Sequence, residues 1–146
     1  MKRIILFSIA AMVAVWLLAQ FVSLVAFRPT NPPVVAEPQW DSPQTRALAQ
    51  RACFACHSNE TVWPLYSYVA PSSVLVVHDV QEGRQEFNFS EWTTRKRLPS
   101  ARKLNEEIAA GSMPPATFLL LHPEARLTDQ EKQQLMRGFE ATLNRK

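Results

Sequence analysis

The feature that most constrains this chain is an uncharged run of 24 residues, from Ile4 to Phe27, which directly follows the basic pair Lys2 and Arg3. As an α-helix rising about 1.5 Å per residue, the run reaches roughly 36 Å, more than the hydrocarbon thickness of about 30 Å in a bilayer. A cleaved signal peptide has a shorter apolar region, about 7 to 15 residues. The run therefore predicts an uncleaved membrane helix over residues 1–28, with a cleaved signal peptide as the alternative. Because the positive charges precede the run, both interpretations export the rest of the chain.

The chain behind this run divides into a linker and one domain. The stretch from Arg28 to Trp40, "RPTNPPVVAEPQW", has four prolines in thirteen residues. Because proline fixes φ and lacks a backbone donor, the stretch predicts a semi-rigid linker over residues 29–40. Residues 41–146 are enough for one small core, which a bound cofactor would help to stabilise.

Charge excludes one class of partner. The net charge is +3, and without Lys2 and Arg3 the rest of the chain has 14 basic against 13 acidic residues. A nucleic-acid-binding surface needs a basic stripe with interleaved aromatic residues. The densest basic cluster, at residues 95–97, is most simply a solvated helix face. We therefore expect no nucleic-acid partner.

Capping and breaking residues predict an all-α domain. Each expected helix begins behind a side chain that can cap it and ends at a glycine or the next loop. Period-two alternation and hairpin signals are absent from the sequence. The expected helices run over residues 44–52 behind Ser42 and Pro43, from Ser72 to Gly83, over 92–97 behind Ser90, over 101–110 between Ser100 and Gly111, and from the capping box of Thr128 and Glu131 to Leu143.

Both cysteines lie in "RACFACHSNETVWP", at Cys53 and Cys56, with His57 next to them. A thioredoxin-like redox pair needs a strand–helix–strand context, which the sequence does not predict. A structural zinc site needs four ligands, so His78 or His122 would have to complete it. Residues adjacent in sequence, such as Cys56 and His57, also crowd poorly around one tetrahedron. Both chemistries stay open as minor alternatives.

The third chemistry needs no additional residue, because Cys-x-x-Cys-His is the attachment sequence of c-type haem. On one helical turn Cys53 and Cys56 stand at positions i and i+3, so both thiols can reach two vinyl groups of one porphyrin. His57 then directs its imidazole at the iron. Export agrees with this interpretation, since c-type haem is attached outside the cytoplasm. The stretch predicts one covalent haem c.

A second axial ligand would come from a loop well separated from His57. Outside the membrane helix the methionines are Met113 and Met136. Met136 lies on the apolar stripe of the last helix, which favours core packing. Met113 lies in "GSMPP", where the proline pair restricts the backbone. We expect Met113 to be the distal ligand, with His78 and His122 as rivals.

Six stretches carry a family resemblance: "CFACHSNETVWP" (53–64), "YSYVAP" (66–71), "HDVQEGR" (78–84), "NFSEW" (88–92), "GSMPP" (111–115) and "HPEARL" (122–127). With them, residues 40–143 resemble the bacterial haem-binding domain family of exported, single-haem c-type proteins. The resemblance implies covalent haem on Cys53 and Cys56 with His57 as proximal ligand. By similarity to cytochrome c domains it implies a cytochrome c-like helical domain with Met113 as distal ligand. It places the single-pass chain in the bacterial inner membrane, with residues 41–146 in the periplasm.

We therefore expect a membrane-anchored monohaem c-type cytochrome that exchanges single electrons with partner proteins in or at the membrane. A His57/Met113-ligated iron has no open position, and methionine raises the potential. Because the sequence offers no activated nucleophile or acid–base pair beside the cysteines, we expect a carrier and not an enzyme. The alternatives are a haem-based gas or redox sensor and a haem subunit of a larger membrane oxidoreductase.

Overall fold

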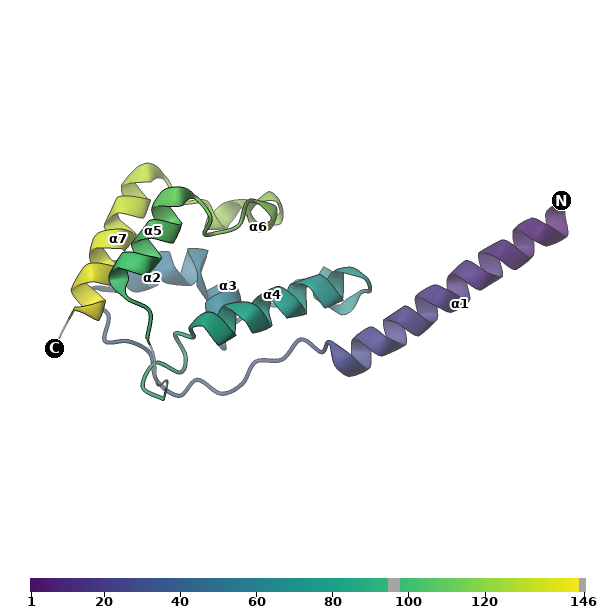
Figure 1. Cartoon of the computed structure of the whole chain (residues 1–146), viewed down its shortest axis with the longest axis horizontal. Coiled ribbons are helices and arrows are strands. Elements are labelled where there is room, and N and C mark those ends of the chain that lie inside the picture. Colours follow the sequence, from purple (N-terminus) through teal and green to yellow (C-terminus); the bar gives the residue numbers. More distant parts are fainter. Residues whose placement is uncertain (95–97, 145–146) are drawn as a thin grey trace. The chain divides into compact units, whose positions relative to one another are not determined.

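The computed structural model describes residues 1–94 and 98–144, and the expected basic helix face at 95–97 lies outside these. Within them the structure is helical, with one isolated backbone bridge between Ala36 and Glu91 and no strand, which confirms the all-α prediction. Figure 1 shows α1 (Lys2–Ala26), α2 (Pro43–Ala52), α3 (Phe54–His57), α4 (Ser72–Glu86), α5 (Ala101–Ala110), α6 (Ala116–Leu121) and α7 (Asp129–Leu143), with short 3-10 turns at Leu65–Tyr68 and Pro123–Ala125.

The chain forms two compact units. The α1 unit comprises residues 1–30 and 62–82, and the cysteine unit comprises residues 31–61 and 83–146. Helix α4 contributes to both. The expected division of the chain at residues 28 and 40 stays a prediction.

The expected long apolar helix is present as α1, whose 25 residues are exposed apart from a few near its end. Its length and composition are sufficient to cross a membrane, as are those of a signal sequence. An α-helix pairs its backbone N–H and C=O groups with one another, and a segment surrounded by hydrocarbon needs this because no water is present to pair with them.

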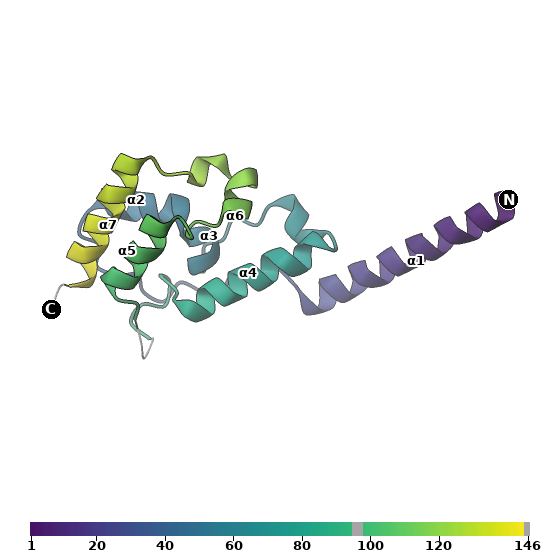
Figure 2. The same ribbon diagram turned by 45° about the horizontal axis from the view of Figure 1, so that its top comes forward.

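The core of the cysteine unit lies where α7 packs against both α2 and α5. Figure 2 shows these three helices together. Leu135 and Phe139 on α7 and Ala49 on α2 are almost fully buried. A Cβ on Gly138 would lie 2.1 Å from Thr45 Oγ1, so the glycine permits the close approach of α7 to α2.

The cap signals at four helix ends are confirmed. Ser42 Oγ accepts from Thr45 N, and Ser100 Oγ accepts from Lys103 N, each at 3.2 Å. Gly111 ends α5 in the left-handed conformation at φ 71°. The capping box of Thr128 and Glu131 begins α7.

Two local predictions were wrong. Residues 92–94 form turns instead of the start of a helix, because the Ser90 hydroxyl accepts from Asn59 N at 2.9 Å and does not cap a helix at these residues. Helix α4 does not stop at Gly83 but continues to Glu86. A Cβ on Gly83 would lie 2.6 Å from the carbonyl oxygen of Cys56, so this glycine serves close packing inside a helix.

The proline-rich residues before α2 are held along the cysteine unit. Val35 N and Ala36 N donate to Ser90 O at 2.8 and 3.1 Å, and Trp92 N donates to Ala36 O at 2.9 Å. Trp40 packs against the buried aromatic core, 5.1 Å from Phe89 between ring centroids. This stretch is therefore extended, as its prolines predict, and also attached to the domain.

Candidate functional site

The cysteine stretch forms one tight turn in which Cys53 both ends α2 and begins α3. The carbonyl of Cys53 accepts from Cys56 N at 3.2 Å and from His57 N at 2.9 Å. Both cysteines are free thiols and partly buried. The structure therefore brings Cys53, Cys56 and His57 together on a single turn, as the Cys-x-x-Cys-His spacing predicts.

The imidazole of His57 is oriented by the backbone of Phe87. Its Nδ1 lies 3.3 Å from the Phe87 carbonyl oxygen. Because a carbonyl only accepts, Nδ1 is the donor in this contact, and in the neutral imidazole the lone pair then lies on Nε2. The Phe87 ring stacks on the imidazole, with centroids 4.0 Å apart and planes 8° apart. A metal-bound histidine commonly donates its other N–H to a carbonyl in this way.

The thiol chemistry argues against a redox pair. Burial, with a smaller contribution from the neighbouring Cys56, raises the pKa of the Cys53 thiol to about 12. The thiol is therefore protonated at neutral pH, whereas redox dithiols react as thiolates. In the part of the chain that the structure describes, no three His, Cys, Asp or Glu side chains gather as a metal site.

Helix α4 supports the turn from one side through its last residues. Arg84 Nε donates to Ser58 O at 2.8 Å, and its terminal nitrogen donates to Thr61 Oγ1 at 3.0 Å and Asn31 Oδ1 at 2.8 Å. Desolvation by burial lowers the pKa of Arg84, although a guanidinium stays charged at any physiological pH. Arg84 thus fixes the backbone that leaves His57.

A buried polar cluster joins the segment behind His57 to the segment behind Phe87. Asn88 Nδ2 donates to Asn59 Oδ1 at 2.8 Å, and Asn88 Oδ1 accepts from Ser90 N at 2.9 Å. Asn59 N donates in turn to Ser90 Oγ. All three side chains are buried and hydrogen-bonded. The cluster therefore fixes the segment after His57 against the segment after Phe87, and with them the distance between the imidazole and the Phe87 carbonyl.

Met113 lies on the connection from α5 to α6, which runs beside α3 in both Figure 1 and Figure 2. The carbonyl of Glu107 accepts from Ser112 N at 3.1 Å and from Met113 N at 3.2 Å. The residue is 42% exposed. Its thioether is thus presented on a loop that is anchored at its helix end. Met136, by contrast, is partly buried against the core, as its place on the apolar stripe predicts.

The two rival histidines lie in different units. His78 belongs to the α1 unit, where its exposed side chain lies 3.4 Å from Glu82. His122 belongs to the cysteine unit, where Nδ1 lies 3.0 Å from the Glu124 carboxylate and the ring stacks on Phe118 at 4.3 Å. The carboxylate orients His122 much as the Phe87 carbonyl orients His57.

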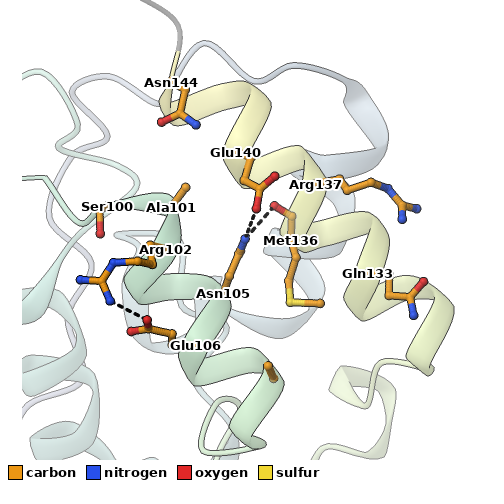
Figure 3. A pocket seen from close by; sticks show the side chains of 11 residues that line it. Ser100, Ala101, Arg102, Asn105, Glu106, Gln133, Met136, Arg137, Glu140 and Asn144 are labelled. Atoms are coloured by element: carbon orange, nitrogen blue, oxygen red, sulfur yellow. Dashed lines mark hydrogen bonds and ion pairs between the residues drawn. The ribbon is translucent and has the colours of Figure 1, made fainter.

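A separate open groove lies between α5 and α7, and Figure 3 shows its lining. Two pairs of its polar side chains interact: Arg102 pairs with Glu106 at 2.5 Å, and Asn105 Nδ2 donates to Glu140 Oε1 at 2.9 Å, while the buried Asn105 Oδ1 has no hydrogen-bond partner among the described residues. The cysteine turn does not contribute to this lining, so the groove is not the candidate site.

Comparison with known proteins identifies the family. The haem-binding domain family matches residues 14–141, a range that includes the cysteine turn, Met113 and the second half of α1. No curated protein and no solved structure matches the chain. Since the match covers most of the sequence, the chain belongs to the haem-binding domain family.

Proposed function

We propose that this protein is a membrane-anchored, single-haem c-type electron carrier. Cys53 and Cys56 would hold the haem covalently, and His57 and Met113 would be its axial ligands. The observation that carries the proposal is the hydrogen bond between His57 Nδ1 and the Phe87 carbonyl, which orients the imidazole and assigns Nδ1 as the donor, so that ligation would use Nε2. Family membership supports the cofactor.

The donor set fits this group. Two thiols at positions i and i+3 suit two thioether bonds, and the imidazole and thioether are the ligand pair of electron-transferring c-type haems. When bound, haem supplies an iron that accepts and releases one electron. The raised pKa of Cys53 keeps this thiol neutral, as addition to a vinyl group needs, and a His57 imidazole that donates through Nδ1 could ligate through Nε2.

The residues around the turn would keep the imidazole fixed between oxidation states. Phe87 covers one face of the ring and its carbonyl prevents rotation, while Arg84 and the Asn59–Asn88 pair hold the two backbone segments together. A fixed ligand limits reorganisation on electron transfer. With Met113 in the remaining axial position a substrate has no place to bind, which favours a carrier over an enzyme.

The partners we propose are redox proteins in or at the bacterial inner membrane, with residues 41–146 in the periplasm. Lys2 and Arg3 before α1 support this orientation, because basic residues stay on the cytoplasmic side.

The test is the absorption spectrum of the reduced full chain with attached haem, before and after addition of carbon monoxide. We expect a low-spin spectrum that the gas leaves unchanged in the wild type and shifts in Met113→Ala. The matched control is His122→Ala, which should behave as the wild type. Gas binding by the wild type would indicate a sensor, and a shift in His122→Ala alone would assign the distal position to His122.

A further inference from the structure

A second uncharged stretch accompanies α1 in the same compact unit. Residues 62–77, "VWPLYSYVAPSSVLVV", contain no Asp, Glu, Lys, Arg or His. They belong to the α1 unit together with residues 1–30. The acidic, basic and histidine side chains of this unit lie only at the ends of its two segments: Lys2, Arg3, Arg28, His78, Asp79 and Glu82.

The amide side chain of Gln20, one of the few polar groups in α1, binds the backbone of this stretch. Gln20 Nε2 donates to Tyr68 O at 2.8 Å, and Gln20 Oε1 accepts from Ala70 N at 2.9 Å. A primary amide pairs here with both polar groups of an extended backbone, as a neighbouring strand would. The sequence alone shows Gln20 only as an interruption of an apolar helix.

Two more side chains of α1 bind the same stretch. Trp16 Nε1 donates to Ala70 O at 3.3 Å, and the hydroxyls of Ser23 and Ser73 lie 2.5 Å apart. Both serines are almost fully buried. Because residues 16, 20 and 23 are spaced by four and three, they lie on one face of α1. That face of α1, formed by Trp16, Gln20 and Ser23, is a docking surface for residues 68–73 of the same chain.

The position of Gln20 along α1 determines how deep this docking surface would lie in a bilayer. Gln20 precedes Ala26, the last residue of α1, by six residues, which is about 9 Å along the helix. The polar interface of a bilayer is about 5 to 7 Å thick on each side, so Gln20 would reach the edge of the outer hydrocarbon when Arg28, beyond the end of α1, stays in water. Backbone groups at that depth need partners inside the protein. Gln20 supplies them for Tyr68 O and Ala70 N.

The outer side of the stretch is apolar and open. Leu65 is 83% exposed, Leu75 is 63% exposed, and Tyr68 and Val69 are each more than 40% exposed. Exposed apolar side chains with no charge among them, beside a helix of membrane length, match the chemistry of lipid.

We propose that residues 65–75 form a lipid-facing segment, held against α1 by Gln20 and Ser23 and inserted into the outer interface of the bilayer. The proposal rests on the membrane anchoring within the proposed function and is independent of haem. Helix α1 is then a structural part of the folded protein as well as its tether.

Hydrogen exchange tests the docking in the full chain in phospholipid nanodiscs. We expect slow exchange over residues 66–73 in the wild type. In Gln20→Leu exchange there should be roughly tenfold faster or more, because two hydrogen bonds are lost. The matched control is Ser8→Leu, a polar-to-apolar change in the same helix that leaves the docking side chains in place. Ser23→Ala, which adds no volume, should produce a smaller acceleration.

Equal exchange over 66–73 in the wild type and in both Gln20→Leu and Ser23→Ala would overturn the docking. Lipid contact needs its own readout, for which vesicles with a photoactivatable diazirine in the acyl chain are suitable. We expect label on α1 and on residues 65–75, and none on α5. Label on α1 alone would overturn the insertion of the segment. Absence of label from α1 would overturn the membrane anchoring itself, whatever the state of the haem.

Discussion

The segments that carry His57 and Met113 are held within the cysteine unit by different means. The His57 segment is fixed by a carbonyl, an arginine and a buried cluster of polar side chains. The Met113 loop is attached through backbone bonds to Glu107, and its side chain is 42% exposed. Folding thus orients the His57 imidazole, whereas in the proposed function the Met113 thioether would still adjust its position to the haem iron. Four predictions test this contrast, from the largest effect to the smallest.

The largest effect should arise from Gly83→Val, which places atoms where α4 meets Cys56. The added Cβ would lie 2.6 Å from the Cys56 carbonyl oxygen, a backbone atom that cannot move without displacing the turn. We expect a loss of about 3 kcal/mol in the free energy of unfolding and poor haem attachment. Urea unfolding of the full chain, monitored by circular dichroism, measures the first. Gly111→Ala is the control: it meets nothing within 4 Å at φ 71° and should cost about 1 kcal/mol.

Asn88→Leu should be the next most severe change. It leaves Asn59 Oδ1 and Ser90 N without their partner in a buried place. Unsatisfied buried groups of this kind cost about 2 to 3 kcal/mol in total. Asn144→Leu, at the exposed end of α7, is the matched control and should change the unfolding free energy by less than about 0.5 kcal/mol. Equal stability of the two variants would show that the polar cluster does not hold the His57 side.

The two methionines should respond in opposite ways. Met113→Ala should lower the unfolding free energy of the haem-free chain by less than about 0.5 kcal/mol, because its side chain is largely exposed. Met136→Ala should cost about 1 to 2 kcal/mol, since it removes a partly buried side chain from the core. With haem attached, only Met113→Ala should change the absorption spectrum. A spectral change in Met136→Ala alone would reverse the two roles.

The smallest expected effect is on the pH dependence of the free energy of unfolding. Hydrogen bonds from Arg46, with a smaller contribution from Trp40, hold the pKa of Glu37 below its ordinary value of 4.5. A lowered pKa in the folded state adds stability that is complete above about pH 4.5 and is lost as the pH falls through the folded pKa. Glu37→Gln should therefore be less stable than the wild type by about 0.5 to 1 kcal/mol at pH 7, and the difference should shrink below pH 4. Unfolding curves at pH 7 and pH 3.5 measure it. A constant difference would contradict the role of the charge.

Signals within a few residues were enough to predict the helix ends. Ser42, Ser100 and Thr128 each cap a helix by bonding a backbone N–H three positions on, and Gly111 ends α5 by adopting a positive φ. These interactions depend on the local sequence alone. Ser90 resembles the same signal, but its hydroxyl binds Asn59, 31 residues away. A distant partner can therefore override a correct local pattern.

The sequence by itself determined that Cys53, Cys56 and His57 lie on one turn and that α1 is a long uncharged helix, because the spacing of these three residues and an uncharged run of 24 residues are local properties. Only the tertiary structure decided which nitrogen of His57 carries the proton, since its partner is a backbone carbonyl that every residue possesses. The same holds for Gly83, whose role depends on what lies opposite it. It holds again for Gln20, whose partners are about 50 residues away in sequence. Contacts of this kind have no signature in the residues that make them until the chain has folded.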